Sequence, residues 1–343
     1  MSLRCSGHLG RWRSCSGWRQ RVVGVPARYI RPVTVNAAFA RRVRADEIAD
    51  PWETHDPRFR GLQGDVRWTV LWDGGRWLEG PAWNPAARLL VFSDTPNNRL
   101  LRLDDVTGAV GVFRQPAGFP NGNTFDREGR LITCEQGARR VVRTEHDASF
   151  TVLADAYAGR PLNSPNDVVV DRVGAIWFTD PPYGISGNYE GRRGAEEQGG
   201  SFVYRVDPSD LRIDRVAGGF ERPTGIAFAP GEEWLYVADS RASTIQRFRR
   251  DGERLGEGEP FVLGAAPSLD SMALDEDGRI WIGALDGVHC YDPDGALLGK
   301  IRLPDAASHV EFGGAECNVL YVCATTAMCA FMLTVRGLAA AER

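Results

Sequence analysis

A short pattern of polar and apolar positions recurs along the chain and organises the rest of the sequence. Each copy begins with a polar residue and reaches an apolar residue four positions later. In the third copy, the apolar run that ends at this position is Val168-Val169-Val170. Runs of this kind, bounded by turn residues, predict a β-strand. The paired positions are Glu79 and Trp83, Asn121 and Phe125, Asn166 and Val170, Thr224 and Phe228, and Asp270 and Leu274, with a sixth copy that ends at Phe312 and begins at Ser308 or His309.

A second apolar run follows most copies after a turn that contains Asp, Glu, Arg or Gly. Each pair of runs predicts a β-hairpin. The expected second strands are Leu89–Ser93, Leu131–Cys134, Ile176–Thr179, Trp234–Ala238, Ile280–Gly283 and Val319–Cys323. Four of these strands are followed directly by an acid, namely Asp94, Glu135, Asp180 and Asp239.

The spacing of the copies predicts the architecture. Their leading residues lie 42, 45, 58, 46 and 39 positions apart when His309 is taken for the last copy, so each unit must stack on its neighbours to bury a face. Six four-stranded units without helical periodicity predict an all-β fold, a six-bladed β-propeller. An N-terminal strand over residues 65–72, which alternates at period two, is expected to close the last blade. A two-sheet sandwich is the alternative, less favoured because the repeats continue to the C-terminus.

The remaining segments are expected to lie outside this repeat. Residues 1–45 hold ten arginines and no acid, which is typical of a transit peptide, a disordered arm or a miscalled start, and we expect a dispensable tail. Residues 46–64 are charged and contain proline, which indicates a lead-in over the domain surface. The propeller is expected over 65–337, with a tail at 338–343. Residues 183–200, rich in Gly, Glu and Arg, are expected to form an inserted loop.

Composition narrows the class of protein. Hydrophobic residues make up 43% of the 343 residues, and no run approaches the ~20 apolar residues of a membrane span. The net charge of −4 offers no footprint for nucleic acid. Seven cysteines without C-x-x-C spacing favour reduced thiols in a cytoplasmic protein. We expect a monomer or homodimer that binds a small molecule and neither nucleic acid nor membrane.

The leading residues are the candidates for chemistry. If each begins the innermost strand of its blade, all six meet at one end of the central channel. Their two carboxylates, with amide and hydroxyl oxygens, are hard ligands that suit calcium, magnesium or manganese. The four acids after the second strands lie at the same ends of the hairpins as the leading residues. They are expected to orient ligands or substrate without binding the metal themselves.

A purely structural interpretation competes with this one, because polar residues at strand starts commonly close turns. Taken singly, Asn121 and Thr224 favour the structural interpretation. Glu79 favours the functional one, since Trp77, Leu78 and Trp83 surround its carboxylate with apolar bulk, where an unpaired charge is costly. The same argument applies with less force to Asp270.

Several motifs together resemble the SMP-30/gluconolactonase/LRE family, from about Trp77 to Gly337. They are Leu78-Glu79-Gly80-Pro81, Asn163-Ser164-Pro165-Asn166-Asp167, Thr179-Asp180-Pro181-Pro182-Tyr183-Gly184, Glu221-Arg222-Pro223 with Leu235-Tyr236-Val237-Ala238-Asp239, and Phe312-Gly313-Gly314. The resemblance implies a six-bladed propeller with one divalent ion at one end of its channel. Ca²⁺ is the preferred ion, and Mg²⁺, Mn²⁺ and Zn²⁺ are the alternatives.

The resemblance also implies which residues bind the ion. Matched position by position, the family ligands fall on Glu79, on Asn166 or Thr224, and on Asp270. Three departures are visible: Thr224 stands where relatives usually carry asparagine, Leu269-Asp270-Ser271 replaces Pro-Asp-Gly, and His309 replaces an asparagine before Phe-Gly-Gly.

The sequence therefore predicts a metal-dependent hydrolase of cyclic esters, with aldonolactones such as gluconolactone as first substrates. The metal is expected to polarise the lactone carbonyl and hold a water, from which Asp270 takes the proton as general base. Substrate-binding candidates are Asn121, Glu135, Tyr183, Arg222 and His309. A phosphotriester hydrolase, and a propeller that binds a ligand without turnover at a decayed site, are the alternatives.

Overall fold

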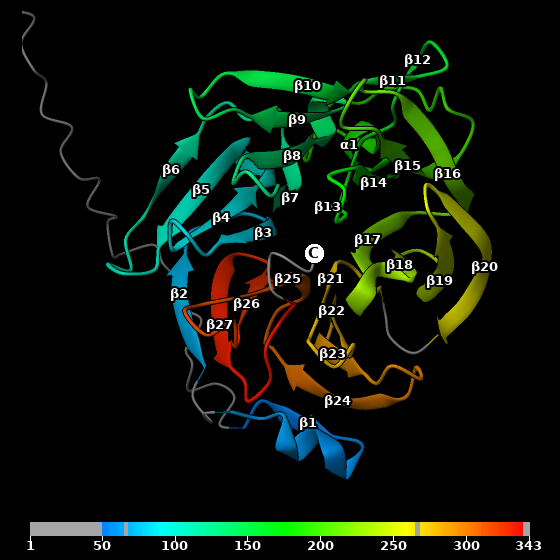
Figure 1. The fold of residues 1–343 in the computed structure, drawn as a ribbon. Helices are drawn as coiled ribbons and strands as arrows, with labels where there is room; N and C mark the ends of the chain where they lie inside the picture. Colours follow the sequence, from blue (N-terminus) through cyan, green and yellow to red (C-terminus); the bar gives the residue numbers. More distant parts are fainter. Residues whose placement is uncertain (1–49, 65–67, 265–267, 339–343) are drawn as a thin grey trace, which may run out of the picture. The chain divides into compact units, whose positions relative to one another are not determined.

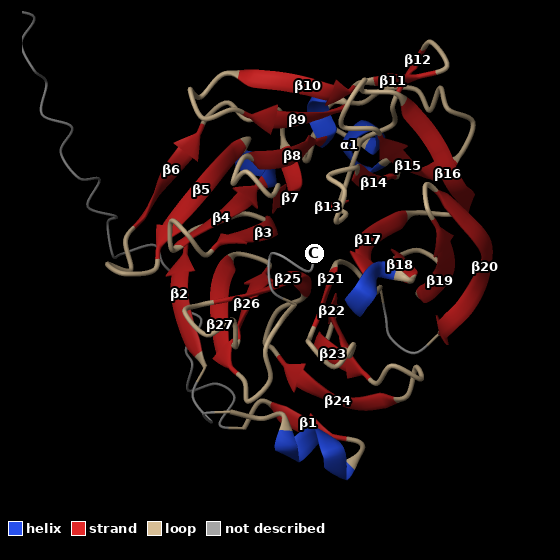
Figure 2. Ribbon diagram, viewed as in Figure 1, coloured by secondary structure: helices blue, strands red, loops and turns tan. Residues whose placement is uncertain are grey.

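The computed structural model describes residues 50–64, 68–264 and 268–338. The predictions for residues 1–45 and for 339–343 therefore lie outside the described residues. The described chain is almost entirely β structure, and its sheets are arranged as the six blades of a propeller (Figures 1 and 2). None of the helices in these ranges is long and apolar enough to cross a membrane.

The first three blades are antiparallel sheets whose strands follow one another in sequence from the channel outwards. They are β3 (Leu78–Asn84), β4 (Leu89–Asp94), β5 (Arg99–Asp104) and β6 (Val110–Arg114); β7 (Pro120–Phe125), β8 (Leu131–Glu135), β9 (Arg140–Thr144) and β10 (Phe150–Ala154); and β13 (Val168–Val170), β14 (Ile176–Asp180), β15 (Ser201–Val206) and β16 (Ile213–Phe220). A small hairpin, β11 (Ala156–Tyr157) and β12 (Arg160–Pro161), precedes the third blade.

The last three blades repeat this arrangement. They are β17 (Pro223–Phe228), β18 (Trp234–Asp239), β19 (Thr244–Asp251) and β20 (Arg254–Leu263); β21 (Met272–Leu274), β22 (Ile280–Ala284), β23 (Gly287–Tyr291) and β24 (Leu297–Arg302); and β25 (Ala307–Gly313), β26 (Val319–Ala324) and β27 (Ala327–Met332). Each predicted second strand is present and extends one residue further than expected, which makes the terminal acid its last paired residue in the first four blades.

The two ends of the propeller are joined as the sequence predicted. β2 (Thr69–Asp73) pairs antiparallel with β27, so it supplies the outer strand of the sixth blade (Figure 1). At the inner strands, the Ser308 hydroxyl donates to the Leu78 backbone oxygen at 2.6 Å and ties the last blade to the first. β2 therefore covers the outer edge of β27, which would otherwise be open.

The segment before β2 does more than lead over the surface. β1 (Trp52–Thr54) pairs with β24 and adds a fifth strand to the fifth blade. A short 3-10 helix, Pro57–Gly61, then brings Phe59 into a fully buried position 6.0 Å from the ring of Trp281. The periodicity of so short a strand is too weak to detect in the sequence.

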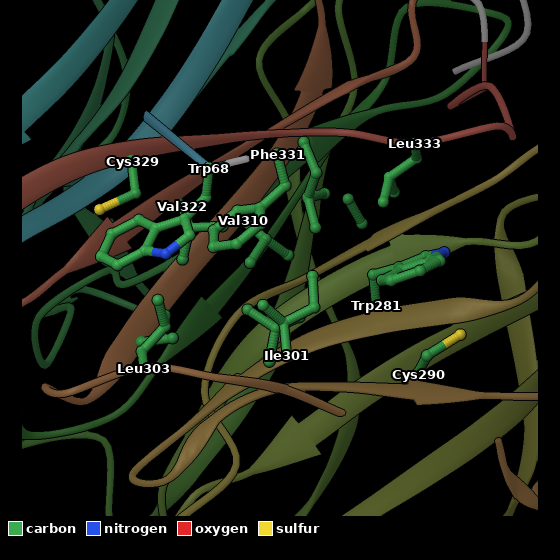
Figure 3. Packing of buried hydrophobic residues seen from close by; sticks show 14 of the residues in the cluster. Trp68, Trp281, Cys290, Ile301, Leu303, Val310, Val322, Cys329, Phe331 and Leu333 are labelled. Carbon is green, nitrogen blue, oxygen red and sulfur yellow. The ribbon is translucent and has the colours of Figure 1, made fainter. Parts of the chain in front are cut away.

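The largest apolar cluster lies between the fifth and sixth blades (Figure 3). Trp68 stacks on Phe331 with 5.7 Å between ring centroids, and Trp281 meets Phe312 edge to face at 6.2 Å. Because full burial of each such side chain contributes about 1.5–3 kcal/mol, stacking of blade on blade supplies much of the stability.

Close backbone approach between neighbouring blades explains the glycines that follow several leading residues. A Cβ placed on the glycine would come within 2.1–2.6 Å of a backbone oxygen of the next blade. The three contacts are Gly80 with Asn121, Gly122 with Asn166, and Gly225 with Asp270. A side chain here would push the leading residues apart, so these glycines set the width of the channel end.

Candidate functional site

The predicted ring of leading residues forms at one end of the inner strands. Glu79, Asn121, Thr224 and His309 lie within β3, β7, β17 and β25, and Asn166 and Asp270 each precede a short strand by two residues. In the four longer strands a register shift lies beside the leading residue. Such β-bulges turn a side chain away from the alternation of the strand.

The sixth blade settles which of its two candidates joins the ring. Ser308 is fully engaged, since its hydroxyl donates to the backbone oxygens of Leu78 and Cys323. His309 instead faces the acids: its Nδ1 lies 3.4 Å from Glu79 Oε2, and its Nε2 lies 3.7 Å from Asp167 Oδ1. The Gly80 backbone N–H donates to Nδ1 at 3.1 Å and holds the ring in place.

Three oxygens in the ring are buried and make no hydrogen bond with any residue that the structure describes. They are Glu79 Oε2, Asn121 Oδ1 and Thr224 Oγ1, on side chains that are 4%, 4% and 2% exposed. Glu79 keeps its other oxygen on the Trp77 indole N–H at 2.8 Å, and Asn121 donates its amide to Gln136 Oε1 at 2.9 Å. These second contacts fix how the two side chains point. Buried oxygens without partners are costly, so the arrangement calls for a cation or a ligand.

The pKa shifts of the acids in the ring also indicate that a positive charge belongs there. Burial raises the pKa of Asp270 well above its ordinary value, and the charges of Glu79 and Asp167 raise it further. Burial also raises the pKa of Asp167, against the opposing effect of His309. These carboxylates lie close together with little positive charge nearby, so they cannot all be ionised at the same time.

His309 adds part of that positive charge when its imidazole is protonated, a form in which Nδ1 faces Glu79 Oε2 and no longer accepts from Gly80. Burial by itself lowers the pKa of the imidazole, but the carboxylates of Asp167 and Glu79 outweigh it, and the pKa is raised. In this chain a titratable side chain thus occupies the position where the family carries an amide. His309 steadies Glu79 and does not leave it alone in the apolar surroundings that the sequence indicated.

The donor set fits one hard divalent cation. Carboxylates of Glu79 and Asp270, the hydroxyl of Thr224 and the amide oxygen of Asn121 are the kinds of oxygen that calcium binds in irregular shells. Within the described ranges, no three His, Cys, Asp or Glu side chains form a metal site by themselves. An ion held here would therefore depend on the neutral oxygens, among which Asn166, 4% exposed, is also placed.

Three of the four strand-terminal acids accept hydrogen bonds from backbone N–H groups at the same place in their blades. Asp94, Asp180 and Asp239 accept hydrogen bonds from backbone N–H groups two or three residues before the leading residue of their own blade. The donors are Arg76 to Asp94, Asn163 and Ser164 to Asp180, and Glu221 and Arg222 to Asp239. These acids position Glu79, Asn166 and Thr224 without touching them.

Glu135, the fourth of these acids, is placed differently from the prediction. Both its oxygens are occupied by ion pairs, with Arg114 Nη2 at 2.8 Å and Arg140 Nε at 2.7 Å. The structure therefore does not bring a free Glu135 carboxylate to the ring, and we withdraw it as a ligand for sugar hydroxyls. Glu135 pairs with Arg140 as Asp94 pairs with Arg99, and its longer side chain also reaches Arg114 on the outer strand β6.

Tyr183 and Arg222 lie together, as two half-buried side chains near Asp270. The Arg222 guanidinium lies 4.7 Å from the centre of the Tyr183 ring, and the tyrosine hydroxyl is 2.5 Å from Ser240 Oγ. Burial raises the pKa of Tyr183, and the negative charge of Asp270 adds to the rise. Tyr183 starts α1 (Tyr183–Ser186), the first turn of the inserted segment that joins β14 to β15.

The comparisons with known proteins agree with this geometry. The model of the SMP-30/Gluconolactonase/LRE-like region matches residues 77–326, well over half of the chain. The chain belongs to this family. A gluconolactonase from Zymomonas mobilis is 32% identical over 251 residues, which cover 66% of this chain and 69% of the relative.

Solved structures of the SMP-30/gluconolactonase family share the fold. A gluconolactonase from Xanthomonas campestris superposes with a TM-score of 0.78 at 36% identity, covering 83% of this chain and 95% of its own. Regucalcin from Agrobacterium tumefaciens, described as a calcium-binding protein, superposes with a TM-score of 0.66 at 19% identity, covering 78% and 94%. At that identity the second likeness concerns the fold alone.

Three further residues at or next to the ring were not singled out from the sequence. Asp167 was open to detection, because it follows a leading residue at the position where Glu79, Asn121 and Thr224 have glycine. Glu190 lies in the inserted segment, which does not repeat, and Gln136 follows the acid of its second strand at the position where the first blade has Thr95. Burial and the charge of Glu79 raise the pKa of Glu190 to about 7, and Gln136 donates to the Glu190 backbone oxygen at 2.8 Å. Only the fold shows that these connections reach the ring.

Proposed function

We propose that this protein hydrolyses sugar lactones at the ring of leading residues, with one divalent cation bound there. The observation that carries the proposal is the set of three buried oxygens on Glu79, Asn121 and Thr224 that make no hydrogen bond with a described residue, beside the carboxylate of Asp270. The gluconolactonase relatives, at 32% and 36% identity, support the substrate class.

The proposed ligands are Glu79, Asn166, Thr224 and Asp270, with Asn121 as a further oxygen. Calcium is the expected ion, because a shell that mixes carboxylate, amide and hydroxyl oxygens is irregular, whereas magnesium requires near-ideal octahedral geometry. When bound, the cation supplies Lewis-acid polarisation of the lactone carbonyl.

Asp270 is the proposed general base. Burial and neighbouring carboxylates raise its pKa, so the ionised form is a stronger base than an ordinary aspartate. It accepts a proton from the water that attacks the acyl carbon. As the acyl carbon–oxygen bond of the ring breaks, the leaving oxygen takes up that proton from Asp270 and becomes the hydroxyl of the open acid.

The remaining residues position the substrate. We assign Tyr183 and Arg222 to the sugar hydroxyls, because the charge of Asp270 acts on Tyr183, the Arg222 guanidinium lies over the Tyr183 ring, and neither side chain is fully buried. His309 holds Glu79 through the 3.4 Å contact between Nδ1 and Oε2, and Asn121 is oriented by Gln136. Each contact limits the poses in which the carbonyl faces Asp270.

The test combines metal analysis with hydrolysis of a lactone panel before and after chelation. We expect about one divalent ion per chain, hydrolysis of aldonolactones that chelation abolishes, and loss of turnover in Asp270→Asn. Bound metal with hydrolysis of phosphotriesters alone would assign the other hydrolase activity. Bound metal without hydrolysis of either class would identify a ligand-binding propeller and overturn the proposal.

A further inference from the structure

A cationic groove adjoins the ring on the same face of the propeller. It has a volume of about 570 Å³ and lies between the first two blades, with Arg114, Arg140, Glu135 and Arg192 in its lining. Glu135 ends β8 opposite Pro120 at the start of β7, so the groove opens on the face where the leading residues gather. Its location near the ring makes it a candidate for part of the substrate.

The groove carries an excess of positive charge. Its lining contains three arginines and one glutamate and no other charged side chain, which leaves a formal charge of +2. Both oxygens of Glu135 are taken by Arg114 and Arg140. Arg192 is exposed and makes no ion pair within the described ranges. A dianion would balance this lining.

Arg114 is buried and only partly paired. Its side chain is only 13% exposed, and its Nε makes no hydrogen bond with any described residue. Burial lowers the pKa of this guanidinium, although Glu135 opposes the effect. The ring of Phe150 covers it, with 5.0 Å between the guanidinium carbon and the ring centre. A guanidinium buried in this way and incompletely paired favours a further anionic group.

One residue separates the groove from the ring. Gln136 follows Glu135, is fully buried, accepts from the Asn121 amide and donates to the Glu190 backbone oxygen. Arg192 lies two residues beyond Glu190 on the same inserted segment, fixed by its backbone N–H to the Gly184 oxygen at 2.9 Å. A ligand that lies along residues 190–192 therefore meets both the carboxylates of the ring and the arginines of the groove.

We propose that this groove binds the anionic substituent of a phosphorylated or sulfonated sugar lactone while its carbonyl faces Asp270. The inference rests on the lactonase activity proposed above and specifies its substrate class. Arginine suits this ligand because its planar N–H groups pair with two oxygens of a phosphate or sulfonate at once.

The test compares gluconolactone with 6-phosphogluconolactone as substrates of the metal-loaded full chain. We expect the ratio of kcat/KM for the phosphorylated to the neutral lactone to fall on the order of tenfold in Arg192→Gln, and further in Arg140→Gln/Arg192→Gln. Arg193→Gln is the matched control, since Arg193 is the next exposed arginine on the segment and does not line the groove. An unchanged ratio in Arg192→Gln would overturn the proposal.

A binding measurement separates this inference from the activity itself. If the protein hydrolyses no lactone, calorimetric titration with 6-phosphogluconate, and with inorganic phosphate as the free anion, still reports on the groove. Binding of the sugar phosphate that weakens about tenfold in Arg192→Gln but not in Arg193→Gln supports the site. Equal affinity in both variants, or binding of phosphate as tight as that of the sugar phosphate, contradicts a substrate subsite.

Discussion

At the scale of single residues, the site is defined by which atoms the fold leaves without partners. Glu79 and Asn121 each use one atom of the side chain for a fixed hydrogen bond and keep one oxygen without a hydrogen bond, although His309 lies 3.4 Å from that of Glu79. Thr224 contributes a buried hydroxyl that makes no hydrogen bond with a described residue, at a position where the family resemblance led us to expect an amide.

Thr224→Asn should tighten divalent binding by about tenfold, the effect of roughly 1.4 kcal/mol. An amide oxygen reaches further and is a stronger donor to a cation than a neutral hydroxyl. Calorimetric titration with Ca²⁺ measures the change, and Thr124→Asn, on the inner strand β7 of the second blade, is the control. Unchanged affinity in Thr224→Asn would place this residue outside the metal shell.

Glu190 gives the metal-free protein a pH dependence. Its pKa is raised from 4.5 to about 7 by burial and by Glu79, so between these values the folded chain holds a proton that the unfolded chain has released. Its contribution to stability is therefore expected to fall as pH rises from about 4.5 to 7. Thermal melts in chelator should show a smaller decrease in Glu190→Gln than in the parent, whereas the exposed Glu196→Gln on the same segment should follow the parent.

At the scale of elements, the hairpins were predictable and the connections were not. The second strands were placed to within one residue, because the apolar alternation and the turn residues both repeat. Asp94, Asp180 and Asp239 were expected behind the ring, and they do hold the backbone before the leading residues. Glu135 differs because its Oε1 pairs with Arg114 on the outer strand β6, and Glu190 lies in a segment that does not repeat.

The clasp formed by Asp239 provides the prediction at this scale. Its carboxylate accepts N–H groups from Glu221, Arg222, Arg241 and Ala242, so both oxygens are occupied. Asp239→Asn turns an amide NH₂ toward at least one of these donors and should destabilise the fold by about 1–3 kcal/mol. Denaturant melts measure the loss, and Asp251→Asn, at an exposed turn of the same blade, should leave stability nearly unchanged. Equal stability of the two variants would mean that the clasp does not hold the loop before Thr224.

At the scale of the whole molecule, closure depends on the segment before the first repeat. β2 supplies the outer strand of the sixth blade, and β1 with Phe59 extends the fifth. The sequence predicted the first contribution from period-two alternation over residues 65–72. It gave no sign of the second, because three residues of strand and one buried ring leave no periodic trace.

A truncation series tests this division of the N-terminal region. Removal of residues 1–49 should leave the melting temperature and the activity nearly unchanged, because residues 1–45 lack the apolar periodicity needed to pack on the domain. Removal of residues 1–62 also takes β1 and Phe59, so it should expose the edge of β24 and cost about 3–5 kcal/mol, the usual effect of losing a buried phenylalanine. Removal of residues 1–74 eliminates β2 as well and should abolish cooperative unfolding, since the sixth blade then has an open edge at β27. A large loss of stability or activity on the first cut would show that the arginine-rich segment belongs to the fold.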